Sequence, residues 1–241
     1  MPPAKTKKRI WKRFSLRAFL ICTTLLSLVI GFYIVAAKKQ AKAVSWCLKH
    51  GGNVDYDSNY DFDKHTSGPA SPEQQWHESA STRDYVSNVV QVRYTSQGSD
   101  PSTLRALTNL DMLVIYDAKQ CDLEICDAFP KLKVLQLLGD GIDDLASLSK
   151  LTNIEQLGLA KLDVENLEPL GKLSLQSLII SDSNIQDFSA LSNLTGLQLL
   201  IIKNTDISDE DLEELEAALP KCYFQIINRN GTVKRITPQG G

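Results

Sequence analysis

The chain has 241 residues and a formal net charge of −3, which conceals a strong asymmetry. The first 43 residues hold ten Lys or Arg and no acid, so the remainder carries 16 basic against 29 acidic side chains, a net charge of −13. An acidic remainder of this size disfavours nucleic acid and anionic lipid as its ligands.

Residues 18–37 contain no charged side chain and are long enough to cross a bilayer as a helix. Seven basic residues lie before this run and three after it: Lys5, Lys7, Lys8, Arg9, Lys12, Arg13 and Arg17, then Lys38, Lys39 and Lys42. This excess predicts a basic cytoplasmic segment over 1–17, a single-pass signal anchor over 18–37, and a periplasmic remainder. A cleaved signal peptide is the alternative, with Ala41-Lys-Ala43 as its cleavage site. The length of the apolar run favours the uncleaved anchor.

We expect a juxtamembrane linker and N-terminal cap over 38–85. Within it, acidic and amide residues alternate with Tyr56, Ser58, Tyr60 and Phe62; they are Asp55, Asp57, Asn59, Asp61 and Asp63. The pattern resembles the start of a calcium loop, but Tyr60 stands where that loop needs glycine and Thr66 where it needs glutamate. An amphipathic strand or hairpin is therefore predicted instead.

Catalytic and cofactor motifs are absent from the sequence. It has no G-x-S-x-G, phosphate-binding loop, H-E-x-x-H or dinucleotide motif. Its three histidines, His50, His65 and His77, lack the spacing of a metal site. We therefore predict no enzyme, no metal and no cofactor. The least favoured hypothesis is a metal-dependent envelope enzyme that uses Asp55–Asp63 and a nearby histidine.

A repeat of fixed length occupies residues 86–221. Its units begin with Leu113-Val-Ile115, Leu135-Gln-Leu137, Leu157-Gly-Leu159, Leu178-Ile-Ile180 and Leu200-Ile-Ile202, at spacings of 22, 22, 21 and 22 residues. This period predicts a leucine-rich repeat solenoid of five to six units. Apolar residues every three positions, such as Leu145 and Leu148, predict short helical or 3₁₀ return legs.

The two ends of the array depart from the pattern. Val90-Gln-Val92 predicts a degenerate first unit, 23 residues before Leu113-Val-Ile115, and Gln120-Cys121 predicts a distorted turn. Ser208 is expected to cap a helix with an apolar stripe that ends at Pro220. Residues 222–241 should form a C-terminal cap, with strands over Tyr223–Ile227 and Thr232–Ile236 around Asn230-Gly231.

The cysteines leave two interpretations open. An exported domain permits a disulfide, and Cys121 and Cys126 are nearest in sequence. The favoured interpretation is that they are small buried residues.

The strands predict a binding surface. Because the paired Leu and Ile residues point inward, their neighbours must form the concave face. The predicted protein-binding residues are Met112, Val114, Tyr116, Val134, Gln136, Leu138, Ile179, Leu199, Ile201 and Lys203. This face is unusually apolar, which is typical of a contact surface, with Tyr116, Leu138, Ile179 and Ile201 as anchors. The alternatives are that the cap or a second copy covers it, or that several of these residues are core.

Arg13-Phe-Ser-Leu-Arg17 opens the apolar run, Gly51-Gly-Asn-Val-Asp-Tyr-Asp57 follows it, and the array ends at Ala218-Leu-Pro-Lys-Cys222. These three parts carry a resemblance to the short membrane-anchored leucine-rich repeat proteins of planctomycete bacteria. It implies a solenoid outside the membrane with an interaction role and no catalytic residues. Three units have the family's polar turn residue, as Asp140, Ser183 and Thr205, and two units have Ala118 and Leu162 in its place. This difference predicts an incomplete ladder of turn hydrogen bonds.

These features predict a membrane-anchored, non-catalytic protein that binds another protein or peptide through its concave face, and does not bind nucleic acid. A structural or self-associating envelope protein is the alternative.

Overall fold

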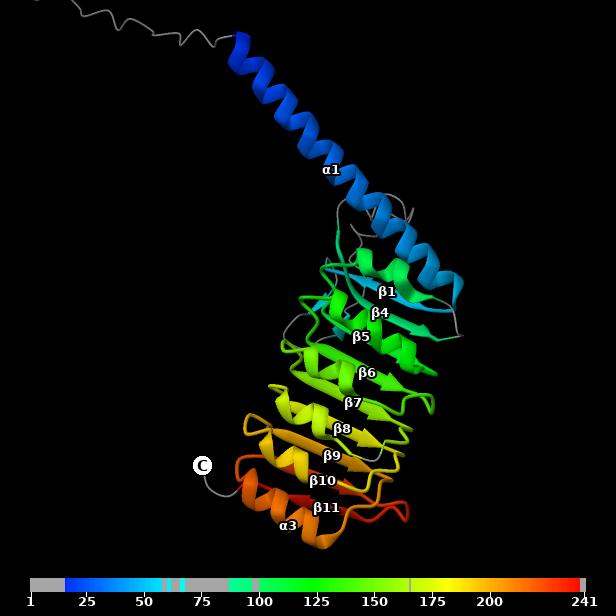
Figure 1. Ribbon diagram of the computed structural model, residues 1–241, viewed down its shortest axis with the longest axis vertical. Helices are drawn as coiled ribbons and strands as arrows, with labels where there is room; N and C mark the ends of the chain where they lie inside the picture. The colour runs from blue at the N-terminus through cyan, green and yellow to red at the C-terminus, as the bar shows by residue number, and fades with distance from the viewer. Residues whose placement is uncertain are drawn as a thin grey trace, which may run out of the picture.

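The repeats stack into one elongated solenoid with a long helix projecting from its N-terminal end (Figure 1). The computed structural model describes residues 16–57, 60–61, 66–67, 87–96, 100–164 and 166–238. Nine strands form one sheet in the order β1-β4-β5-β6-β7-β8-β9-β10-β11. They are β1 (Asn53–Tyr56), β4 (Val89–Thr95), β5 (Met112–Tyr116), β6 (Val134–Leu138), β7 (Gln156–Ala160), β8 (Ser177–Ser181), β9 (Leu199–Lys203), β10 (Tyr223–Ile227) and β11 (Val233–Ile236).

The parallel ladder from β4 to β10 places the repeated leucines in one buried column. Leu113, Leu135, Leu157, Leu178 and Leu200 are paired from strand to strand in register. Each is at most 2% exposed, as are the second apolar residues of the same pairs. Burial of one such side chain contributes about 1.5–3 kcal/mol. The predicted leucine-rich repeat solenoid is confirmed.

The return legs of the units are 3₁₀ helices. They are η3 (Pro101–Ala106), η4 (Gln120–Ala128), η5 (Ala146–Lys150), η6 (Glu168–Lys172) and η7 (Ser189–Asn193). An Asp or Asn precedes four of them and accepts a hydrogen bond from the backbone N–H two residues on, as Asp144 does from Ala146 at 2.7 Å. This repeated acceptor was not identified from the sequence. It fixes where each return leg begins.

The predicted distortion in the first full unit is present. The 3₁₀ helix η4 has nine residues, whereas η5, η6 and η7 have five each. The Gln120 side chain compensates by bonding to the next unit: its Nε2 donates to the Asp144 carbonyl at 2.8 Å, and its Oε1 accepts from the N–H of Asp143 and Asp144.

The degenerate first unit exists as β4, but the predicted register was wrong by two residues. Val92 pairs with Leu113 and Tyr94 with Ile115, so the inward pair is Val92 and Tyr94. Apolar residues alternate over three successive positions here, and alternation alone does not select two of them. The selection comes from Tyr94, which is 1% exposed and donates from its hydroxyl to buried Asp122 at 3.1 Å.

At the other end, the predicted capped helix and the two predicted C-terminal strands are present. Ser208 is the N-cap of helix α3 (Asp209–Ala218), as predicted: its Oγ accepts from the Asp211 N–H at 3.0 Å. Strand β10, however, is parallel to β9 and in register with it, so the repeat sheet continues to Ile227. The chain then turns back, and β11 pairs antiparallel with β10 as the last strand of the sheet.

The turn hydrogen-bond ladder is restricted to the last units. The Leu162 N–H donates to Ser183 Oγ at 3.1 Å, and the Ser183 N–H donates to Thr205 Oγ1 at 3.1 Å. Asp140 takes no part: its side chain is exposed and accepts from Lys119 Nζ at 3.2 Å. The incomplete ladder predicted from Ala118 and Leu162 is therefore present.

Helix α1 (Leu16–Lys49) continues well past the uncharged run and becomes part of the solenoid. Ala43, Val44 and Cys47 are at most 3% exposed. Gln40 Nε2 donates to the Ser87 carbonyl at 2.8 Å. Gly51, at φ +68°, then turns the chain back into β1. The start of the segment expected to be a juxtamembrane linker and N-terminal cap is thus a helix that covers the end of the solenoid.

Gly139 allows two units to approach closely. A Cβ atom there would lie 2.4 Å from the Ala118 nitrogen and 2.6 Å from its carbonyl oxygen. We therefore expect Gly139→Ala to lower the free energy of unfolding by about 1–3 kcal/mol, because backbone must shift. The measurement is a urea titration of the full-length protein in detergent.

The matched control for this prediction is Gly196→Ala. Its Cβ would meet nothing closer than the Leu175 carbonyl oxygen at 3.7 Å. That variant should change stability by less than about 1 kcal/mol. Equal losses in both variants would contradict the close approach.

Candidate functional site: the concave face

Strand pairing arranges the concave side chains in three rows across the repeats. The first row comprises Gln91, Met112, Val134, Gln156, Ser177, Leu199 and Tyr223; the second comprises Arg93, Val114, Gln136, Gly158, Ile179, Ile201 and Gln225; the third comprises Thr95, Tyr116, Leu138, Ala160, Ser181, Lys203 and Ile227. Antiparallel β11 adds Arg235 to the second row and Val233 to the third. All ten residues predicted for this face lie in these rows.

Two of the ten predicted residues are not accessible. Val114 and Val134 are each 2% exposed and therefore belong to the packed part of the face. Both lie towards the N-terminal end of the face, on β5 and β6. They are corrected from contact residues to supporting residues. Sequence alternation assigns a side chain to a face but does not measure its exposure.

Large apolar side chains remain accessible on β5, β8 and β11. Tyr116 is 43% exposed, Ile179 37% and Val233 42%. Between Tyr116 and Ile179, Gly158 and Ala160 on β7 are small, and Gln136 and Leu138 on β6 are half-buried. Exposed apolar groups arranged around small residues suit contact with a partner's side chains.

The N-terminal end of the face is closed by internal polar contacts. Strand β1 pairs antiparallel with β4, and Arg93 Nη2 lies 3.1 Å from Asp55 Oδ2. Asp57 accepts from the N–H of Asn88 at 3.1 Å and from its side-chain amide at 2.9 Å. Tyr56 points the other way and is 4% exposed. Of the predicted alternation of acids and aromatics, β1 contains Asp55 and Tyr56, whose side chains lie on opposite faces.

Tyr60 and Asp61 of the Asp55–Asp63 segment form a short strand. Strands β2 (Tyr60–Asp61) and β3 (Thr66–Ser67) pair antiparallel. Asn59, Asp63, His65 and His77 lie outside the described residues. His50 stacks on Trp46 at a ring-centroid distance of 4.3 Å and bonds to the Trp46 carbonyl. Among the described residues, no three His, Cys, Asp or Glu side chains converge to hold a metal ion.

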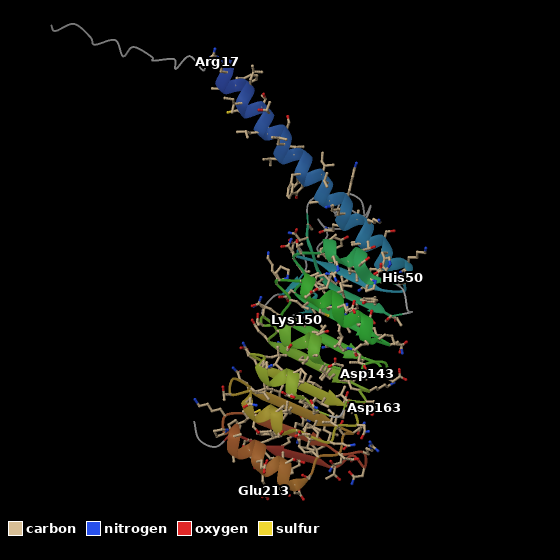
Figure 2. All side chains as sticks on the ribbon, viewed as in Figure 1. Arg17, His50, Asp143, Lys150, Asp163 and Glu213 are labelled. Carbon is tan, nitrogen blue, oxygen red and sulfur yellow. The ribbon has the colours of Figure 1, made fainter. Side chains whose placement is uncertain are left out.

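Side chains beyond the ends of the strands form features separate from the concave face. Figure 2 shows Asp143 and Asp163 on the side of the solenoid towards which the strands run, with Lys150 on the opposite side. A groove of about 560 Å³ follows the start of the strands. Two of its charged side chains pair with each other, Lys133 Nζ and Glu155 Oε1 at 3.0 Å. Its other lysine, Lys131, donates to Asn109 at 2.6 Å.

The thiols of Cys47, Cys126 and Cys222 are buried and free. None of these three forms a disulfide. Burial, together with the nearby Asp122 and Asp127, raises the pKa of Cys126 to about 12. Burial also raises the pKa of Cys47 and of Cys222 to about 11. The Cys121 side chain lies outside the described residues.

These thiols should react slowly in the folded protein. At pH 8, raising a thiol pKa from the usual 9.0 to about 11 lowers the thiolate fraction about 100-fold. We expect iodoacetamide to label Cys47, Cys126 and Cys222 at least about 100-fold more slowly in native than in guanidinium-unfolded protein, as measured by peptide mass mapping. Equal rates at Cys126, or a peptide pair disulfide-linked through it, would contradict the buried free thiol.

Helix α1 is the one described segment long and apolar enough to cross a membrane. Most side chains in the uncharged run are exposed, including Phe19, Leu28 and Phe32, whereas Ala37 at its end is buried. The helix also lies near the N-terminus, where signal sequences have the same character. Figure 2 shows Arg17 at its far end and His50 where it meets the repeats.

Solved structures similar to this chain are leucine-rich repeat proteins. An internalin, inlF, from Listeria monocytogenes is 26% identical over 55% of this chain and 41% of its own, with a TM-score of 0.45. Internalin C2 of the same organism is 22% identical over 56% and 70%, with a TM-score of 0.43. A leucine-rich repeat protein of Leptospira interrogans is 19% identical over 55% and 40%, with a TM-score of 0.41. This chain thus spans less than half of the first and third proteins.

No protein-family model and no curated protein matches the chain. The fold therefore follows from its own strand topology and buried leucine column: a leucine-rich repeat solenoid preceded by one long apolar helix.

Proposed function

We propose that this protein is a membrane-anchored recognition module that binds another protein or peptide through its concave face. The observation that carries the proposal is the set of exposed apolar side chains on that face, Tyr116 and Ile179 above all. Half-buried Leu138 and Ile201 extend it, and Met112, Gln136, Leu199 and Lys203 complete the contact set. Binding through such a rigid surface needs little rearrangement of the repeats.

The proposed anchor is α1, uncleaved, with residues 1–17 in the cytoplasm and the solenoid in the periplasm. Cleavage after Ala43 would cut a helix at two buried residues, Ala43 and Val44. It would also remove Gln40, whose side chain donates to the Ser87 carbonyl and accepts from the N–H of Val89, the first residue of β4. Only about 9 Å of helix separates residue 37 from Ala43, so the solenoid would sit directly on the membrane surface.

We also propose that the protein belongs with the planctomycete-type short membrane-anchored repeat proteins and is non-catalytic. The support is the order of basic segment, apolar helix and repeat array. The alternative function is an envelope spacer that associates only with itself.

In-cell crosslinking of the full-length protein, followed by its recovery in detergent, separates these functions. The recognition module predicts a heterologous polypeptide in the recovered complex. Recovery of the protein alone, or only of its own multimers, would support the spacer and contradict a separate partner.

A further inference from the structure

The C-terminal third of the concave face combines apolar surface with unpaired positive charge. Ile179, Leu199, Ile201, Tyr223, Ile227 and Val233 provide the apolar part, which we term the C-terminal platform. Lys203 stands on β9 in the third row, and Arg235 stands on β11 in the second. Both cations are exposed.

No acidic side chain stands on the concave rows from β5 to β11, all of which the structure describes. Lys203 and Arg235 form no ion pair with any described residue. Asp182 directly follows β8 and lies outside the concave rows. Its carboxylate accepts a hydrogen bond from Asn204 Nδ2 at 2.9 Å. On the opposite face of β11, by contrast, Lys234 does have a partner, Asp209 on α3, at 3.8 Å.

This charge pattern opposes that of the rest of the domain. Residues 44–241 carry a net charge of −13, yet the concave rows from β5 to β11 carry only two charges, both positive. A positive, apolar surface inside a negative domain complements a segment that carries acidic and apolar side chains. The negative surroundings disfavour a long polyanion such as nucleic acid, which would extend beyond the platform.

We propose that the C-terminal platform binds an acidic polypeptide segment. Apolar side chains of that segment contact Ile179 and Ile201, and its carboxylates pair with Lys203 and Arg235. The proposal rests on the proposed function, because it specifies the partner chemistry for the same face. Charge pairs at the solvent-exposed margin of an interface contribute more to selectivity and association rate than to total affinity.

The test uses a phage-displayed library of random 16-residue peptides, selected on full-length protein in nanodiscs. Wild type should enrich peptides rich in Asp and Glu with interspersed apolar residues. The variant Lys203→Glu/Arg235→Glu should lose this preference and bind the selected acidic peptides at least about 10-fold more weakly. Raising the salt concentration should weaken wild-type binding.

The matched control is Lys150→Glu/Lys172→Glu, which changes net charge equally at exposed residues that end η5 and η6. It should retain the acidic preference, and circular dichroism should show that both variants are folded. The proposal is overturned if wild type enriches no acidic peptides over empty nanodiscs, or if the Lys203→Glu/Arg235→Glu variant selects the same acidic peptides. A concentration-dependent dimer that this charge reversal abolishes would assign the surface to a second copy instead.

A further variant, Ile179→Ser/Ile201→Ser, separates this inference from the proposed function. If this variant loses the partner recovered by crosslinking while the charge reversal does not, only the acidic preference fails. If neither variant affects that partner, the concave face itself is excluded as the binding site.

Discussion

Substitution of Ile179 and Ile201 by aspartate is expected to lower affinity for the crosslinked partner at least about 30-fold, the effect of losing one strong contact residue. The two residues are neighbours in register on β8 and β9, in the middle row of the face. Aspartate in both positions would place carboxylates in an interface that excludes water. Titration of the purified partner against variant and wild type by calorimetry measures the loss.

The matched control is Thr152→Asp/Thr195→Asp. These threonines are exposed in the loops that lead into β7 and β9, so the control adds the same charge away from the concave rows. It should bind as wild type does. Unchanged affinity in a folded Ile179→Asp/Ile201→Asp protein would exclude the concave face as the binding site.

Substitution of Val44 by aspartate should be the most destabilising of the changes considered, at more than about 3 kcal/mol. Val44 is 3% exposed between α1 and the first strands of the solenoid. A carboxylate there would be buried without a charged partner, or α1 would detach from the solenoid. Hydrogen exchange of β1 and β4 in nanodisc-embedded protein would detect detachment as faster exchange.

The adjacent residue provides the control, because Ser45 is exposed on the same helix. Ser45→Asp should leave exchange in β1 and β4 unchanged. If Val44→Asp also leaves it unchanged, the end of α1 is not an essential cap.

The solenoid was predictable because each unit repeats the same physical requirement. A leucine such as Leu157 must be buried on its strand, and the next unit must present another at the same depth to cover it. Where this requirement changes, prediction failed: the register of β4 depended on Tyr94 and its bond to Asp122, which are 28 residues apart in sequence.

The end of α1 was missed although its sequence contains a signal. Ala37, Gln40, Val44 and Cys47 recur at intervals of three and four, the spacing of one helical face. The lysines that follow the uncharged run suggested that the helix ended there. Instead, Lys38, Lys39 and Lys42 lie on its exposed side, where charge does not interrupt a helix.

The candidate site was predictable as a set of positions but not as a surface. Period-two alternation assigned Tyr116, Ile179 and Ile201 to the concave face. It did not reveal the burial of Val114, nor the addition of Arg235, which requires β10 to join the parallel sheet before the chain turns back.

The central claim, that the concave face contacts a polypeptide partner, is tested most directly by photo-crosslinking in cells. A benzophenone amino acid would replace, one at a time, Gln156 and Ser181 on the concave rows and Lys172 and Ser189 on the 3₁₀ helices behind the sheet. Contact through the concave face predicts one heterologous adduct from both concave positions and none from the other two. Adducts only from Lys172 and Ser189, or equally from all four positions, would contradict it.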